Sequence, residues 1–188
     1  GHKLGSFYNS YMNEAKLEEL GLTALQPQLE LIQGLKDKKQ LASTFASLQR
    51  DGVTIPLGWY VNNDAKKSTE YAVYADQSGL GLPDRDYYLK DDARSAELLG
   101  QYQAFITKLW TLAGMDNAEQ AAADIVALEK QIAAAQWSRV QNRDRNATYN
   151  KLTIAELTKL APGFNWQAFV TAAGLGNINE LVIRQPSY

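Results

Sequence analysis

The chain has 188 residues, of which 45% are hydrophobic, and a formal net charge of −2. This size and composition suit a globular domain, and the slightly negative charge gives no overall positive field for nucleic acid or an anionic membrane surface. The sequence contains no cysteine, which excludes disulfides, thiolate metal sites and a cysteine nucleophile. No apolar run approaches the roughly 20 residues of a membrane span. We therefore expect no nucleic-acid partner and no membrane contact from this segment.

The only histidine is His2, one residue from the start of the sequence. One histidine cannot form a His-x-x-x-His zinc pair or a three-histidine zinc site, and a serine–histidine relay would require this terminal residue to be ordered and buried. We therefore predict no catalytic residue, no cofactor-binding residue and no metal ligand in this chain.

Residues 1–50 are predicted to be helical. Apolar residues recur at intervals of three and four positions over residues 4–20, 25–35 and 41–48. Glycines follow these stretches as helix ends, at positions 21, 34 and 52. Pro27 is compatible with the first turn of the second helix.

Residues 53–89 contain segments in which side chains alternate with a period of two, as in β-strands. Residues 57–62 and 69–75 predict a β-hairpin. The polar connection at residues 63–68 is longer than a tight two-residue turn. The two glycines and the proline of residues 79–83 then predict a fixed, irregular loop.

Residues 90–140 are predicted to form a long helical hairpin. Asp91 or Asp92 caps the first helix, and Gly114 ends it. Residues 116–119 resemble a capping box that opens a second helix. Two long helices with so short a connection pack antiparallel.

Residues 141–188 combine short helices with a terminal strand. A second capping box at residues 153–156 opens one helix, and Asn165 caps another. Residues 181–184 have the pattern of a strand, which Pro186 ends.

Two segments rich in side-chain oxygens resemble functional sites, one a calcium-binding loop and the other an acid/base pair. Residues 142–146 place side-chain oxygens at alternate positions, as a calcium loop does, but Ala147 and Thr153 stand where that loop needs glycine and glutamate. A polar turn is the better interpretation. Asp84 and Asp86 are spaced closely enough for an acid/base pair, yet the arginine between them favours an ion-paired anchor for the loop.

A group of basic residues near Trp137 and Tyr149 is the nearest approach to a nucleic-acid-binding stripe. The group consists of Arg139, Arg143, Arg145 and Lys151. Because Asp144 lies among them and the chain is net acidic, a solvated or internally paired face is favoured.

Several ordered segments carry a resemblance to a known family. They are FYNSYMNE at residues 7–14, GLGLPDRDYYL at residues 79–89, YNKLTIAEL at residues 149–157 and FNW at residues 164–166, supported by LEKQI at residues 128–132. The combination resembles the N-terminal region of the neprilysin family, which are zinc endopeptidases that cut oligopeptides. The resemblance spans almost the whole chain, and the loop motif is its most specific part.

The resemblance implies a mainly α fold, a multi-helix domain with one β-hairpin that is part of the helical non-catalytic lobe of a neprilysin-like peptidase. In that family two mainly helical lobes enclose a cavity, and the zinc motif His-Glu-x-x-His lies downstream of the matched region. We therefore expect residues 1–188 to be a single truncated domain, inactive alone and without a cofactor, from a parent that carries zinc. Its implied role is a wall of the substrate-sequestering cavity that restricts substrate size.

The resemblance also implies partners and a location. The expected partners are the missing C-terminal catalytic lobe of the same polypeptide and, in the parent, oligopeptide substrates. Animal members carry a cysteine where Tyr11 stands, so this sequence is more similar to the bacterial oligoendopeptidase O type. Some bacterial members are exported, which makes a periplasmic or secreted parent the expectation.

Within the loop motif we expect a rigid structural brace formed by Gly81, Pro83, Arg85, Asp86 and Tyr87. Glycine permits an unusual backbone, proline stiffens it, and arginine can donate several hydrogen bonds. Two other classes of function stay open. One is a stand-alone peptide- or protein-binding helical module with an exposed hairpin edge or apolar groove, and the other is a small hydrolase with two facing carboxylates.

Overall fold

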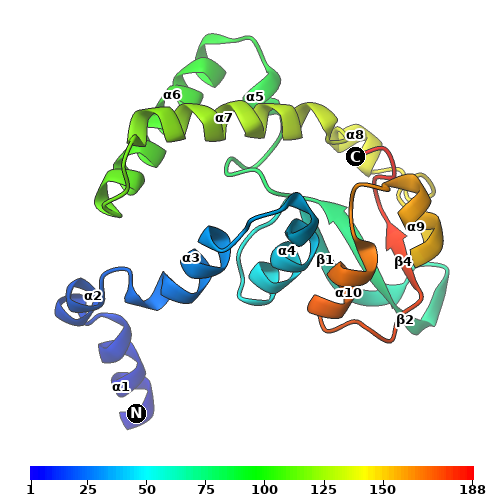
Figure 1. Cartoon of the computed structure of the whole chain (residues 1–188), viewed down its shortest axis with the longest axis horizontal. Helices are drawn as coiled ribbons and strands as arrows, with labels where there is room; N and C mark the ends of the chain where they lie inside the picture. The colour runs from blue at the N-terminus through cyan, green and yellow to red at the C-terminus, as the bar shows by residue number, and fades with distance from the viewer. The chain divides into compact units, whose positions relative to one another are not determined.

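The computed structural model describes all 188 residues, which form two compact units, Gly1–Lys36 and Asp37–Tyr188 (Figure 1). The first unit is helical. Its elements are α1 (His2–Tyr11), α2 (Glu14–Leu20), the 3-10 helix η1 (Thr23–Leu25) and α3 (Gln26–Gln33). Pro27 lies in the first turn of α3, as predicted. None of the 36 residues of this unit is buried.

The prediction of one continuous helix over residues 4–20 is wrong, because the chain breaks after Tyr11. Asn13 is the N-cap of α2, and its side-chain oxygen accepts a hydrogen bond from the Lys16 N–H at 3.0 Å. A short polar side chain of this kind competes with helix continuation and favours a new helix start. Gly21 ends α2 with a φ of 49°, as the sequence predicted.

The second unit is built around a four-stranded sheet in the order β1-β2-β4-β3. Its strands are β1 (Leu57–Asp64), β2 (Lys67–Gln77), β3 (Asn150–Thr153) and β4 (Glu180–Ile183). The hairpin pair β1 and β2 is antiparallel, β2 and β4 are parallel, and β4 and β3 are antiparallel. The predicted hairpin and terminal strand are confirmed. The sequence did not predict β3, because Leu152 is its only apolar residue, whereas β4 contains three apolar residues, two of them β-branched.

The predicted long connection between the hairpin strands is wrong. Only Ala65 and Lys66 separate β1 from β2. Asp64 Oδ1 accepts hydrogen bonds from the Lys66 and Lys67 N–H groups at 2.8 and 3.2 Å. This side chain closes a tight turn, so both strands extend into the polar segment.

Alternation along the strands divides the sheet into two faces. Val73 and Ala75 of β2, with Leu181 and Ile183 of β4, face the main apolar core. That core also includes residues of α4 (Leu41–Arg50), α9 (Ile154–Leu160) and α10 (Trp166–Ala172). Figure 1 shows α4 and α10 on one side of the sheet. Ala72, Tyr74 and Val182 form a smaller cluster with Tyr149. Because successive side chains of a strand point to opposite faces, the same strands contribute residues to both apolar clusters.

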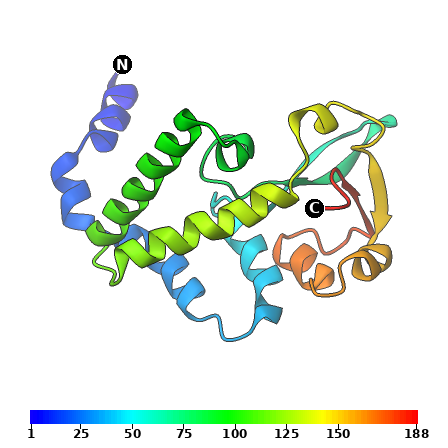
Figure 2. The ribbon, with the colours of Figure 1, turned by 90° about the horizontal axis from the view of Figure 1, so that it is seen from above.

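The predicted helical hairpin is α6 (Ala93–Leu112) and α7 (Ala118–Ala135), which lie side by side in Figures 1 and 2. Ile106, Ala122 and Val126 are buried between them. Asp92 caps α6, as predicted. The expected capping box at residues 116–119 is wrong. Asn117 has a left-handed φ of 58°, and its side chain makes no capping hydrogen bond.

Several short helices complete the second unit. They are η2 (Lys38–Gln40), α5 (Asp86–Leu89) and α8 (Arg139–Asn142). The sequence predicted none of them, because a helix of three or four residues is too short for helical periodicity. The capping box that opens α9 is confirmed: Thr153 and Glu156 hydrogen-bond each other's backbone N–H groups.

Candidate functional site

A buried carboxylate, Glu129 of α7, joins the loop at residues 79–89 to the helical hairpin. The residue is 9% exposed. Its Oε1 accepts hydrogen bonds from the Gly81 N–H and the Tyr102 hydroxyl, each at 3.1 Å, and its Oε2 accepts one from the Tyr88 hydroxyl at 2.7 Å. The three donors belong to the loop, α6 and α5. One side chain therefore holds three separate segments together.

The two tyrosines stay protonated and act as donors to Glu129. Burial raises the pKa of the Tyr88 hydroxyl far above its ordinary value, and the hydrogen bond and charge of Glu129 raise it further. Burial, followed by the charge of Glu129, raises the pKa of Tyr102 to about 12. The Tyr88 hydroxyl also accepts a hydrogen bond from the Leu82 N–H at 2.9 Å. Tyr88 thus connects the loop backbone to the buried carboxylate.

Two loop glycines are required by close packing. A Cβ added at Gly81 would lie 1.8 Å from the Tyr102 hydroxyl oxygen. At Gly79 the φ is 86°, and an added Cβ would lie 2.6 Å from Pro56 Cα. Any larger residue at either position would displace the loop from its supports.

The residues predicted as the brace occupy different environments. Gly81 is exposed but bonded to Glu129 through its N–H, Pro83 and Asp86 are exposed, and Tyr87 and Arg85 are half-buried. Arg85 donates a hydrogen bond to the Gln136 carbonyl at the end of α7, while its Nε is buried and has no partner. The brace role itself stays a prediction; Gly81 links the loop to Glu129 within α7, and Arg85 links it to the residue that follows α7.

Asp84 is an ion-paired loop anchor, as predicted, but its partner is Arg139 and not the neighbouring Arg85. Its Oδ2 accepts a hydrogen bond from Arg139 Nε at 2.6 Å, and its Oδ1 accepts one from the Asp86 N–H at 2.9 Å. Burial opposes ionisation of Asp84, but these bonds outweigh it and lower the pKa of the carboxyl. Asp86 pairs with Lys90 at 3.2 Å. Both carboxylates are therefore engaged as ions, which favours anchoring over acid/base chemistry.

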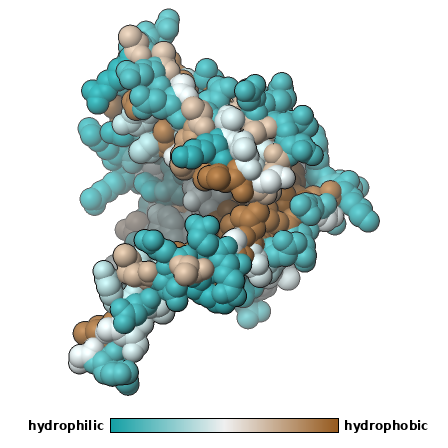
Figure 3. Space-filling view, turned by 90° about the vertical axis from the view of Figure 1, so that its left-hand side faces the viewer, coloured by the Kyte–Doolittle hydropathy of each residue, from teal (hydrophilic) through white to brown (hydrophobic).

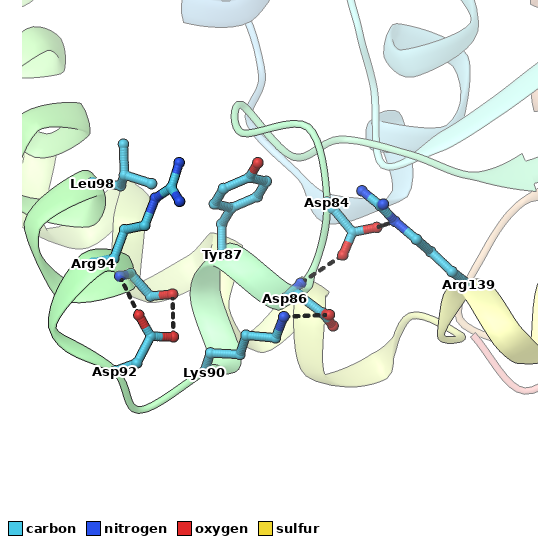
Figure 4. A pocket seen from close by; sticks show the side chains of 9 residues that line it. Asp84, Asp86, Tyr87, Lys90, Asp92, Arg94, Leu98 and Arg139 are labelled. Atoms are coloured by element: carbon cyan, nitrogen blue, oxygen red, sulfur yellow. Dashed lines mark hydrogen bonds and ion pairs between the residues drawn. The ribbon is translucent and has the colours of Figure 1, made fainter.

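These charged residues line a cavity of about 310 Å³, which we call the Arg94 pocket (Figure 4). Its lining consists of Asp84, Asp86, Tyr87, Lys90, Asp92, Arg94, Ser95, Leu98 and Arg139. The pocket lies where the loop, α5 and the start of α6 meet.

A second buried carboxylate, Asp64, fastens the hairpin turn to the segment with the YNKL motif. Asp64 is 2% exposed, and the Tyr149 hydroxyl donates to its Oδ1 and Oδ2 at 2.8 and 3.0 Å. Lys151 Nζ lies 3.1 Å from Oδ2. The backbone hydrogen bond from Lys66, followed by the one from Tyr149, lowers the pKa of Asp64 to about 2. Asp64 is therefore ionised in the folded protein at neutral pH.

The anchoring roles of Glu129 and Asp64 were not predicted from the sequence. A signal for Glu129 is present, because Ala122, Val126, Glu129 and Ala133 are spaced by three and four positions and are the buried residues of α7. A charged residue on such a stripe needs partners. No local signal marks Asp64, whose partners Tyr149 and Lys151 are more than eighty positions away.

The chain has no cluster of metal-ligand side chains. No group of three or more His, Cys, Asp or Glu residues is arranged to hold a metal ion, and His2 is exposed in α1. The residues present therefore do not fit a zinc site. No helix is both long and apolar enough to span a membrane.

Comparison with known proteins identifies the family. The model of peptidase family M13 matches residues 1–188. The chain is 33% identical over 173 residues to endothelin-converting enzyme 1 of Bos taurus, covering 87% of this chain and 23% of that protein. It is 30% identical over 183 residues to human endothelin-converting enzyme-like 1, covering 88% of this chain and 23% of that protein.

Solved structures agree with this assignment. The inhibitor complex of the Mycobacterium tuberculosis zinc metalloprotease Zmp1 is 38% identical, with a TM-score of 0.89, over 98% of this chain and 28% of Zmp1. PepO from Lactobacillus rhamnosis HN001 has the same fold, with a TM-score of 0.70 at 19% identity over 90% of this chain and 27% of PepO. The chain thus spans about a quarter of the length of these relatives. It belongs to peptidase family M13, the neprilysin family of zinc metallopeptidases, and has the mainly helical fold of that family's N-terminal region.

Proposed function

We propose that this chain is the non-catalytic N-terminal part of a zinc metalloendopeptidase that hydrolyses oligopeptides. In this proposal it forms a wall of the cavity that encloses the substrate, and it restricts substrates by size. Its partner is the C-terminal catalytic lobe of the same polypeptide. The family match supports this assignment, because much longer relatives match 87% to 98% of this chain while it covers only 23% to 28% of their length.

The apolar surface of Gly1–Lys36 is the observation that carries the proposal. Eleven large hydrophobic side chains of this unit are exposed. They are Leu4, Phe7, Tyr8, Tyr11, Met12, Leu17, Leu20, Leu22, Leu25, Leu31 and Ile32. The largest exposed fractions are 77% at Leu4 and 75% at Phe7. Apolar surface of this extent marks an interaction site, and a helical unit that buries none of its own residues needs a partner to be stable.

The helical hairpin has a second exposed apolar stripe. Phe105, Leu109 and Leu112 are spaced by four and three positions along α6 and are 56%, 49% and 73% exposed. This spacing places them on one face of the helix. Figure 3 shows one side of the molecule, on which hydrophobic side chains reach the surface among hydrophilic ones. An outer stripe of this kind fits a helix that packs against another part of a larger protein.

Catalysis is assigned to the C-terminal lobe in this proposal. The zinc motif of the family requires two histidines, whereas this chain contains one. In this proposal the 188 residues form part of the cavity wall, and Glu129 and Asp64 hold that wall in shape. We also propose that the parent is exported to the periplasm or secreted, as expected for the bacterial oligoendopeptidase O type.

A graft tests the proposal. The region of Zmp1 that matches this chain is replaced by residues 1–188, and cleavage of a short quenched peptide and of a folded protein is measured. We expect the graft to bind zinc and to cleave the peptide but not the folded protein. A zinc-loaded graft that degrades the folded protein as fast as the peptide would refute the size-restricting role.

The same exposed surface would also suit a stand-alone peptide- or protein-binding module, which is the alternative function. The graft separates the two, because a module that evolved for another partner would not restore peptide cleavage. Light scattering of the chain alone adds a second test. The wall proposal expects self-association through the exposed apolar stripes, and a strict monomer would favour the independent module.

A further inference from the structure

The Arg94 pocket contains two polar groups without a partner. Arg94 takes part in none of the ion pairs of the chain, and its guanidinium makes no hydrogen bond. The Tyr87 hydroxyl likewise makes no hydrogen bond, although Tyr87 is half-buried. In Figure 4 the Arg94 guanidinium and the Tyr87 hydroxyl point to the same side, away from the Lys90–Asp86 pair. The cavity therefore presents unused donors from two neighbouring elements.

The carboxylates of the pocket do not compete for these donors. Asp84 is bonded to Arg139 and to the Asp86 N–H, and Asp86 pairs with Lys90. Asp92 accepts from Ser95, through the N–H at 2.9 Å and the hydroxyl at 2.8 Å. Each acidic group already has its partner within the pocket. Of the three basic side chains, only Arg94 is left without an anion.

We propose that the Arg94 pocket binds an aliphatic carboxylate of the size of a glutamate side chain. A guanidinium can hold a carboxylate through two parallel N–H···O bonds, and a phenol can add a third donor. Leu98 lines the same cavity and offers an apolar contact for the aliphatic stem. A volume of about 310 Å³ accommodates a single side chain. This site is independent of the role of the chain as a cavity wall.

The ligand chemistry is tested by NMR titration of the 188-residue chain. The probe is N-acetyl-glutamate N-methylamide, and the neutral comparison is N-acetyl-glutamine N-methylamide. We expect saturable shifts of the Arg94 Nε–Hε and Tyr87 amide signals with the glutamate probe only. A single charge-assisted contact of this kind suggests a dissociation constant on the order of 1 mM.

Variants identify the residues responsible. Arg94→Gln should weaken binding at least about tenfold, and Tyr87→Phe about threefold. Arg94→Lys, which keeps the charge but loses the paired donors, should fall between wild type and Arg94→Gln. Arg145→Gln is the matched control, because Arg145 is also exposed and unpaired but lies outside the pocket. It should bind as wild type.

Three results would overturn the proposal. They are no saturable shift at Arg94 in the wild-type chain, equal binding of the glutamine probe, and equal loss of binding in Arg94→Gln and Arg145→Gln. Because Arg94 is exposed and unpaired, its variants should melt as wild type, so a loss of binding is not explained by unfolding.

Discussion

The helices of the two units have the same amphipathic spacing of apolar residues, but only those of the second unit bury their apolar faces within the unit. Asp37–Tyr188 contains all three apolar clusters of the chain, whereas Gly1–Lys36 buries no residue. In the second unit, helices α4 and α10 find a sheet to cover. In the first, α1 to α3 expose leucine and aromatic side chains. The spacing of apolar residues therefore predicts that a helix packs one face against another element, but it does not say which part of the polypeptide supplies that element.

The stability of the second unit should depend most on Glu129. Glu129→Gln keeps the side-chain shape, but its amide NH₂ would face hydrogen-bond donors that in the wild-type protein donate to the carboxylate. We expect a loss of about 3 kcal/mol in the free energy of unfolding, measured by denaturant melts. Asp124→Asn is the control on the same helix, at an exposed site, and should change stability by less than about 0.5 kcal/mol. Equal effects of the two variants would show that Glu129 is not an anchor.

A smaller loss is expected from Gly81→Ala. The added Cβ would overlap the Tyr102 hydroxyl, so the loop or the tyrosine must move away from Glu129. We expect about 2 kcal/mol of destabilisation in thermal or denaturant melts. Gly100→Ala provides the comparison, because a Cβ there meets no atom within 4 Å and the residue lies in α6. That change should stabilise the protein by about 0.5 to 1 kcal/mol.

Arg85→Ala tests the predicted brace directly. The change removes the donor to the Gln136 carbonyl, and because Arg85 is half-buried we expect a loss of about 1 to 2 kcal/mol. Arg145→Ala should have no measurable effect. An unchanged unfolding midpoint for Arg85→Ala would leave the loop held by Glu129 and Asp84 alone and would reject the brace role of Arg85.

The Asp64 anchor should make the second unit sensitive to acid. The pKa of Asp64 is lowered from 3.8 to about 2 on folding, so its contribution is fully present above pH 4 and is lost as the pH falls toward 2. Asp64→Asn should therefore be less stable than wild type at neutral pH and show a shallower loss of stability across this range. Unfolding curves at a series of pH values measure this. Parallel pH profiles for the two proteins would contradict the assignment.

Removal of residues 1–36 should have the smallest effect. The deleted segment supplies no residue to the apolar clusters of the second unit. We expect the thermal midpoint of residues 37–188 to stay within about 2 °C of the full chain. A large fall in the thermal midpoint would mean that the first unit stabilises the second. The second unit would then not be independent of the first, contrary to the burial pattern.

The sequence predicts most helices and the hairpin because their periods extend over seven or more residues, as in α6 and β2. It did not predict α5 or α8, which are four residues long, or β3, which has a single apolar residue. At the candidate site, the loop motif and the anchoring role of Asp84 could be predicted from residue types, but its partner Arg139 could not. The partners of Glu129 and the distant partners of Asp64 could not, because those contacts join segments 27 to 87 positions apart.

We propose that Gly1–Lys36 packs against another part of an M13 peptidase. Amide hydrogen exchange of these residues tests this most directly, measured in the 188-residue chain at a dilution where it is monomeric and in the Zmp1 graft. We predict that their amides exchange with little protection in the chain alone and at least about a hundredfold more slowly in the graft. Equal exchange rates in the two proteins would contradict the claim.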